Sequence, residues 1–141
     1  MKENSVCKTN ADGSKEWHLN GKRHREGGPA YEGADGRKAW YLNGKLHREG
    51  GPAYEANGNK LWYLNGKRHR EGGPAVEWAN GSKEWLLNSK RHREGGPAIE
   101  YANGSKEWYL NGVEVTPEMV LQYAVDSKNE KAATEFLWSL G

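Results

Sequence analysis

Residues 74–96 read PAVEWANGSKEWLLNSKRHREGG, and this unit of about 23 residues decides the fold because it recurs along the chain. One tryptophan of the unit marks the copies, at spacings of 23, 22, 23 and 23 residues: Trp17, Trp40, Trp62, Trp85 and Trp108. A fixed period of this length is typical of stacked copies of one supersecondary unit. We therefore expect a repeat protein and not a mixed globular core.

Each unit carries the signature of a β-hairpin. Asn-Gly or Asp-Gly lies between two runs, as at Asn80-Gly81, and this pair favours a type I′ turn because both central residues need positive φ. A two-residue turn sets Val76 opposite Trp85. We expect the tryptophan face to be buried and the face with Ala75 and Glu84 to be thin and wet. Paired glycines and a proline then open the next strand, which gives a mainly β, elongated meander of tandem hairpins.

One copy is a residue shorter than the others. Residues 52–58 have lost the position that aligns with Trp78 or Ala79. A slip of one residue turns the rest of a strand to the wrong face. We therefore predict a bulge or an altered turn near Tyr54–Asn59 that keeps Trp62 in the aromatic row.

The repeats end before the chain does. We assign residues 1–112 to the hairpin array, as an N-terminal half-unit, four full units and one partial unit, and residues 113–141 to a short helical cap. Thr116 is the predicted N-cap of a first helix, with Pro117 at its first position, and Ser127–Glu130 reads as the capping box of a second. Apolar residues recur at helical spacing there: Met119, Val120, Tyr123, Ala133, Phe136, Leu137 and Leu140. A lid over the last hairpin is the main expectation, and a pair of helices that docks a partner is the alternative.

The composition restricts the class of protein. Hydrophobic residues make up 35% of the chain, mean hydropathy is −1.06, and seven Trp and seven Tyr argue against disorder. Cys7 is the only cysteine, so an internal disulfide is excluded. The start, MKENSVCKTN, lacks the apolar run of a signal peptide, and no stretch has the roughly 18 apolar residues of a membrane span. We expect a soluble, cytoplasmic protein.

Basic residues cluster in the bend of each unit. Every cluster has a surplus of positive charge, while the whole chain is only +2. If the bends align, they form a basic edge that can meet phosphates, an acidic protein or anionic headgroups. The alternative is ordinary solvated bend residues with local Arg–Glu compensation. The candidates are Lys22, Arg23, Arg25, Lys45, Arg48, Lys67, Arg68, Arg70, Lys90, Arg91 and Arg93.

Neither a metal site nor a catalytic centre is predicted. The four bend histidines of successive units would lie roughly 9.6 Å apart, which is too far to share one ion, so we expect them to be structural. They are His24, His47, His69 and His92. No nucleophile, base or phosphate loop is recognisable, and we expect no cofactor and no enzyme. The tryptophan row is mainly a core, with a ligand groove as the alternative.

The spacing from Trp85 to Gly95, set in a 23-residue period with Asn-Gly turns, resembles the MORN repeat. The likeness is greatest to the variant MORN-type repeats of uncharacterised bacterial and phage proteins, and it covers roughly residues 11–112. The His-x-x-Gly part matches, for example at His24 and Gly27, whereas the Tyr-x-Gly entry is absent and the motif's His-Gly is His-Arg. The resemblance implies hairpin repeats in an elongated sheet, and binding or scaffolding roles toward proteins or anionic lipid.

We therefore expect a non-enzymatic interaction module that binds a macromolecular partner, most often a protein, through its repeat surface. The resemblance suggests a phage or bacterial regulator or inhibitor of a host system. The alternative is a binder of a phosphate-bearing ligand, such as a nucleotide, nucleic acid or acidic lipid, through the basic edge. The exposed edge of the sheet at the N-terminus leaves homo-oligomerisation open.

Overall fold

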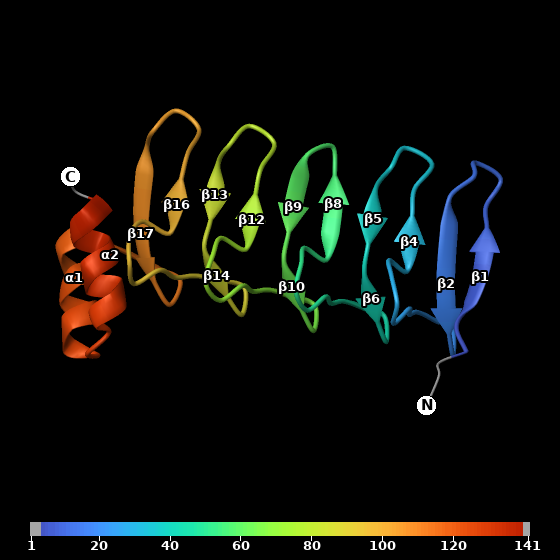
Figure 1. The fold of residues 1–141 in the computed structure, drawn as a ribbon, viewed down its shortest axis with the longest axis horizontal. Helices are drawn as coiled ribbons and strands as arrows, with labels where there is room; N and C mark the ends of the chain where they lie inside the picture. The colour runs from blue at the N-terminus through green and yellow to red at the C-terminus, as the bar shows by residue number, and fades with distance from the viewer. Residues whose placement is uncertain (1–3, 140–141) are drawn as a thin grey trace. The chain divides into compact units, whose positions relative to one another are not determined.

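The computed structural model describes residues 4–139, and it confirms a mainly β chain of antiparallel hairpins that ends in two helices (Figure 1). The chain divides into two compact units, the first ending at His69 and the second beginning at Arg70. The same plan governs both units: hairpins stand side by side, and each is followed by a bend that leads into the next.

In the first unit the hairpin strands pair in chain order, β1-β2-β4-β5-β8-β9, and β3 pairs with β2. Two short ribbons, β6-β7 and β10-β11, lie off this path. The bounds are β1 (Val6–Thr9), β2 (Lys15–Leu19), β3 (Lys22–Arg23), β4 (Tyr31–Glu32), β5 (Lys38–Ala39), β6 (Tyr41–Leu42), β7 (Lys45–Leu46), β8 (Tyr54–Ala56), β9 (Asn59–Leu61), β10 (Tyr63–Leu64) and β11 (Lys67–Arg68).

The second unit has the strand order β12-β13-β16-β17-β18, with the ribbon β14-β15 beside it. Two helices follow the last strand. The bounds are β12 (Val76–Glu77), β13 (Lys83–Glu84), β14 (Leu86–Leu87), β15 (Lys90–Arg91), β16 (Ile99–Glu100), β17 (Lys106–Leu110), β18 (Val113–Val115), α1 (Pro117–Asp126) and α2 (Glu130–Ser139).

The predicted register of the long hairpins is wrong by one residue. Val76 lies opposite Glu84 and not opposite Trp85. The cause is the loop, where Gly81 has a φ of 96° but Asn80 keeps negative φ and accepts the Ser82 N–H on its side chain at 2.8 Å. This is a three-residue loop, a type I turn followed by a glycine in a left-handed conformation. It absorbs one residue more than a type I′ turn does.

The two-residue turns lie at the other end of each 23-residue repeat. Asn43 and Gly44 have φ values of 50° and 79°, and they join β6 to β7 with Leu42 opposite Lys45. The same pair of positive φ values recurs in every unit, and Ser89 adopts it with a φ of 67° where the other units have glycine. The type I′ signal was therefore correct in kind, but it belongs to the Leu-Asn-Gly end of the unit.

The short copy confirms the prediction of an altered turn. Asn57 and Gly58 both have positive φ, 52° and 85°, and Ala56 lies opposite Asn59. The missing residue has turned a three-residue loop into a two-residue one. Leu61 keeps the position next to Trp62 that Ala39 has next to Trp40, so the register survives.

The deepest positions belong to small residues. The alanine after each proline is completely buried, and its N–H donates across the hairpin, as from Ala75 to the Glu84 carbonyl at 2.8 Å. The residues concerned are Ala30, Ala53, Ala75 and Ala98. Our assignment of Ala75 and Glu84 to a wet face was wrong: they are 0% and 8% exposed. The row tryptophans are only partly buried, because the shifted register places the alanines at the centre of the sheet.

The helical cap follows the prediction for α1 and departs from it for α2. Thr116 caps α1 by accepting the Met119 N–H, and Pro117 is its first residue. The N-cap of α2 is Asn129, whose side chain accepts the Ala132 N–H, and not Ser127, which ends α1. Leu140 lies outside the described residues. Among residues 4–139, the helices are too short and too polar to cross a membrane.

Candidate interaction surface

In each basic cluster, the arginine that directly follows the histidine is part of the framework. The guanidinium carbons of Arg25, Arg48 and Arg93 lie 3.9, 3.9 and 3.8 Å from the ring centres of Trp17, Trp40 and Trp85. This cation–π geometry holds the bend against the tryptophan of its own unit.

The same arginines also tie the bend to the next strand. Each Nη1 donates to the carbonyl of the proline four residues later, at 3.0 to 3.1 Å: Arg25 to Pro29, Arg48 to Pro52, Arg70 to Pro74 and Arg93 to Pro97. Beside the guanidinium lies the second glycine of the pair. A Cβ on Gly96 would lie 3.0 Å from Cζ of Arg93, so the glycine makes room for the arginine. The motif Arg-Glu-Gly-Gly-Pro is therefore a structural lock.

The arginine that precedes the histidine is held by a carboxylate in two of the clusters, whereas Leu46 stands at this position in a third. Nη2 of Arg23 lies 2.9 Å from Glu16, and Nη2 of Arg91 lies 3.2 Å from Glu84. Hydrogen bonds to the side chains of Asn10 and Arg23 keep the pKa of Glu16 below its usual value. These arginines therefore carry charges that the chain already neutralises.

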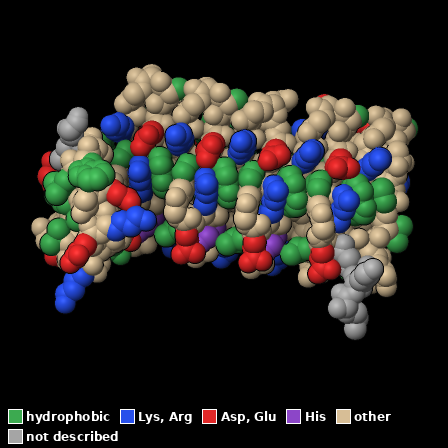
Figure 2. Space-filling view, viewed as in Figure 1, with side chains coloured by type: hydrophobic (Ala, Val, Ile, Leu, Met, Phe, Trp, Pro, Cys, Tyr) green, Lys and Arg blue, Asp and Glu red, His purple; other side chains and the backbone are tan. Residues whose placement is uncertain are grey.

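The lysines of the clusters remain at the surface. Within residues 4–139, Lys22, Lys45, Lys67 and Lys90 are exposed and form no ion pair. The stems pack over the next turn, since a Cβ on Gly44 would lie 3.6 Å from Lys22. On the face shown in Figure 2, Lys and Arg side chains lie beside Asp and Glu side chains along the hairpins. Each predicted basic cluster thus keeps one lysine that forms no ion pair within the described residues.

The bend histidines connect each 23-residue repeat to the next one. Nδ1 of His92 accepts the backbone N–H of Asn111 at 2.9 Å, and His24 and His47 accept Asn43 and Asn65 in the same way. The Nε2–H of His92 then donates to Glu94 at 3.1 Å, and Asn129 donates to the same carboxylate from α2 at 3.0 Å. Burial alone would raise the pKa of Glu94, but the two hydrogen bonds outweigh it and lower that pKa.

Grooves separate successive bends. In the first unit a cavity of about 400 Å³ lies between the bend at Arg25–Gly28 and Trp40. Its counterpart between Arg70 and Trp85 has about 600 Å³, and α2 forms one wall of it. Within residues 4–139, no three His, Cys, Asp or Glu side chains are grouped so that they could hold a metal ion.

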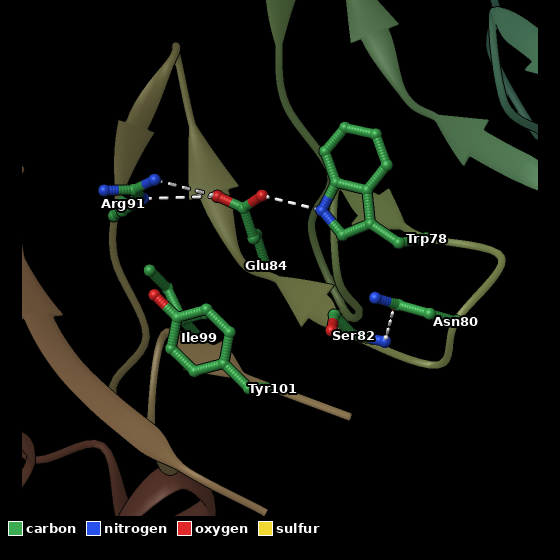
Figure 3. A pocket seen from close by; sticks show the side chains of 7 residues that line it. All are labelled: Trp78, Asn80, Ser82, Glu84, Arg91, Ile99 and Tyr101. Atoms are coloured by element: carbon green, nitrogen blue, oxygen red, sulfur yellow. Dashed lines mark hydrogen bonds and ion pairs between the residues drawn. The ribbon is translucent and has the colours of Figure 1, made fainter. Parts of the chain in front are cut away.

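A second aromatic feature was missed by the sequence analysis. Trp78 and Tyr101 occupy the same loop position in successive hairpins, they are 37% and 40% exposed, and they line a cavity of about 290 Å³ (Figure 3). Ile99 and Ser82 also line this slot. The sequence signal was present: this position holds Asn10, Gly33, Trp78 or Tyr101 in an otherwise regular repeat.

The polar atoms of the two slot rings are bonded within the chain. Nε1 of Trp78 donates to Glu84 at 2.9 Å, and the Tyr101 hydroxyl donates to Glu107 at 2.7 Å. Glu84 also accepts from Arg91 on its other oxygen, so its carboxylate lies between the two donors (Figure 3). Hydrogen bonds from Tyr101 and Tyr109 lower the pKa of Glu107. The Trp78 N–H and the Tyr101 O–H are therefore not available to an occupant of the slot.

Neither a protein-family model nor a curated protein sequence matches this chain. The likeness to the MORN repeat therefore still depends on the motif spacing alone.

Proposed function

We propose that this chain is a non-enzymatic module that binds another protein through the surface of its repeats. One observation carries the proposal: the rings of Trp78 and Tyr101 stand partly exposed on neighbouring loops while their polar atoms are bonded internally. Exposed rings of this kind are what interface cores use, because they bury large area at small entropic cost.

The distribution of exposed apolar side chains supports the same proposal. All but one of the large apolar residues that the described range exposes lie in the second unit, the exception being Val6. Trp138 is 81% exposed and Leu137 55%. Large apolar side chains left exposed on a chain with so much polar surface favour a partner site in this part of the protein.

The alternative is a phosphate-bearing ligand on the basic edge, and one observation favours it. The four bend lysines are exposed and form no ion pair within the described residues. Against it, the arginines are engaged with tryptophans, carbonyls and carboxylates. A polyanion site needs several uncompensated charges that act together, so we rank this function second.

The test is capture of proteins by the tagged full chain, at low and at high salt. We expect the captured protein to persist at high salt and to be lost from Trp78→Asn/Tyr101→Asn. The matched variant changes the four bend lysines to glutamine and should keep the captured protein. Loss of binding at high salt and in the lysine variant, with binding unchanged in the ring variant, would establish the anionic ligand instead.

The biological setting of the proposal follows from the MORN-type resemblance. A bacterial or phage module of this kind acts as a regulator or an inhibitor when it occupies a surface of a host protein. Such a role requires only binding, which a repeat surface can supply without a catalytic group. An assay of the captured protein's own activity, with and without the chain, tests it.

A further inference from the structure

We infer that the slot between Trp78 and Tyr101 binds an extended, proline-containing segment of a partner protein. This inference rests on the proposed function and names the chemistry of its partner. It begins with what the slot offers: the rings of Trp78 and Tyr101, the side chain of Ile99 and no free donor on either ring. An occupant with polar edges would therefore find no hydrogen-bond donor on the rings themselves.

Proline fits this lining better than a nucleobase or a cation does. Its side chain is an apolar ring. Segments rich in proline already adopt an extended helix in the free state, so they lose little backbone conformational entropy on binding. Grooves lined by aromatic rings bind such segments because the proline ring packs against the aromatic rings and needs no hydrogen bond there.

The rim of the slot supplies what the backbone of an extended segment needs. A polyproline helix has no internal hydrogen bonds, so its carbonyls remain acceptors. Arg91 lines the slot with its side chain 44% exposed, and Nε and Nη2 face Glu84. The rest of the guanidinium is a donor for a partner carbonyl, held in place by the carboxylate.

Two other occupants agree less well with the charges and donors. A nucleobase carries donors and acceptors on its edges, but the Trp78 N–H and the Tyr101 O–H are not available to it, because both donate to carboxylates. A cation would meet the ring faces, but Arg91 neutralises the one buried carboxylate, Glu84. The slot is therefore close to neutral, which suits an uncharged ring.

Comparison with the first unit indicates that the slot is a built feature of this chain. At the equivalent place, Asn10 donates to Glu16 at 3.0 Å and Arg23 holds the same carboxylate. The framework of loop donor, glutamate and arginine is thus the same, but Asn10 and Gly33 stand where Trp78 and Tyr101 stand. The ring at this place is Tyr31, which takes the position of Ile99 and whose centre lies 5.1 Å from Cζ of Arg23. The slot thus differs by two rings at the loop position.

The same comparison provides a test variant that should fold. Trp78→Asn and Tyr101→Asn reproduce the Asn10–Glu16 pair, so the side-chain bonds to Glu84 and Glu107 can both be kept. The control is Trp138→Asn, which removes another exposed indole that does not line the slot. Circular dichroism and thermal unfolding verify that all variants remain folded.

The experiment is selection from a displayed library of random peptides on the full chain, after depletion on the double variant. We expect enrichment of sequences with proline, and a synthetic peptide from this pool should shift the Trp78 indole N–H signal in the NMR spectrum of the chain. The peptide should bind at least about tenfold more weakly to either single variant and equally well to Trp138→Asn.

Two results overturn the inference. One is a pool without proline or without any enrichment, and the other is binding of adenosine monophosphate that shifts the Trp78 signal and excludes the peptide. The proposed function is tested separately from the slot assignment. If the full chain still captures a protein whose binding ignores both ring changes, protein binding stands and the slot assignment falls.

Discussion

The lock formed by Arg93 is a quantitative test of how the repeat is stabilised. Its guanidinium lies 3.8 Å from the Trp85 ring centre, donates to the Pro97 carbonyl at 3.1 Å and pairs with Glu100 at 2.9 Å. We consider Arg93→Met, which keeps the stem and removes the charge. The losses are about 1 kcal/mol for the cation–π contact, about 1.5 for the charged hydrogen bond and about 0.5 for a partly exposed ion pair.

Together these losses give a destabilisation of about 3 kcal/mol in the free energy of unfolding. The measurement is urea unfolding followed by circular dichroism, with hydrogen exchange of residues 97–101 as a local readout because repeat arrays can unfold in parts. Lys90→Met is the control, an exposed cation of the same bend, and its effect should stay within about 0.5 kcal/mol.

A double-mutant cycle then tests the reason for the glycine. A Cβ at position 96 would lie 3.0 Å from Cζ of Arg93, so Gly96→Ala should destabilise the native chain, and much less so once Arg93 is Met. Additive effects, or a loss below about 1 kcal/mol for Arg93→Met, would refute the view that this arginine locks the bend.

Three further predictions follow from single contacts. Ser89→Gly should stabilise the chain by about 1 kcal/mol in thermal or urea unfolding, because Ser89 has a φ of 67° where the other units have glycine; an unchanged midpoint contradicts this. His92→Phe leaves the Asn111 N–H without its acceptor and should cost about 1–3 kcal/mol, with faster exchange of that amide as the specific sign. The pKa of Glu94 is lowered in the folded chain, so its contribution is present above the usual glutamate pKa of about 4.3 and is lost as the pH falls below it. Glu94→Gln should therefore flatten the loss of stability in acid, and an unchanged acid limb would exclude this carboxylate as a contributor.

The sequence by itself determined the repeat, the order of hairpin and bend, and the start of α1. These follow from local rules: a fixed tryptophan period, Asn-Gly pairs that accept positive φ, and a Thr-Pro helix start. The compensating turn of the short copy was predictable for the same reason, since one missing residue can be absorbed only where the chain reverses.

Only the tertiary structure decided the register and the uses of the charges. Asn-Gly closes a two-residue turn at Asn43 but a three-residue loop at Asn80, and the choice depends on which pairing buries the alanines. The basic cluster looked uniform in the sequence, yet Arg93 packs on a ring and Arg91 on a carboxylate, while Lys90 stays in solvent. Those partners lie in other segments of the chain, and a slot between two loops exists only when folding places Trp78 and Tyr101 on neighbouring hairpins. The local sequence determines where the chain turns, whereas packing between successive repeats determines what each side chain contacts.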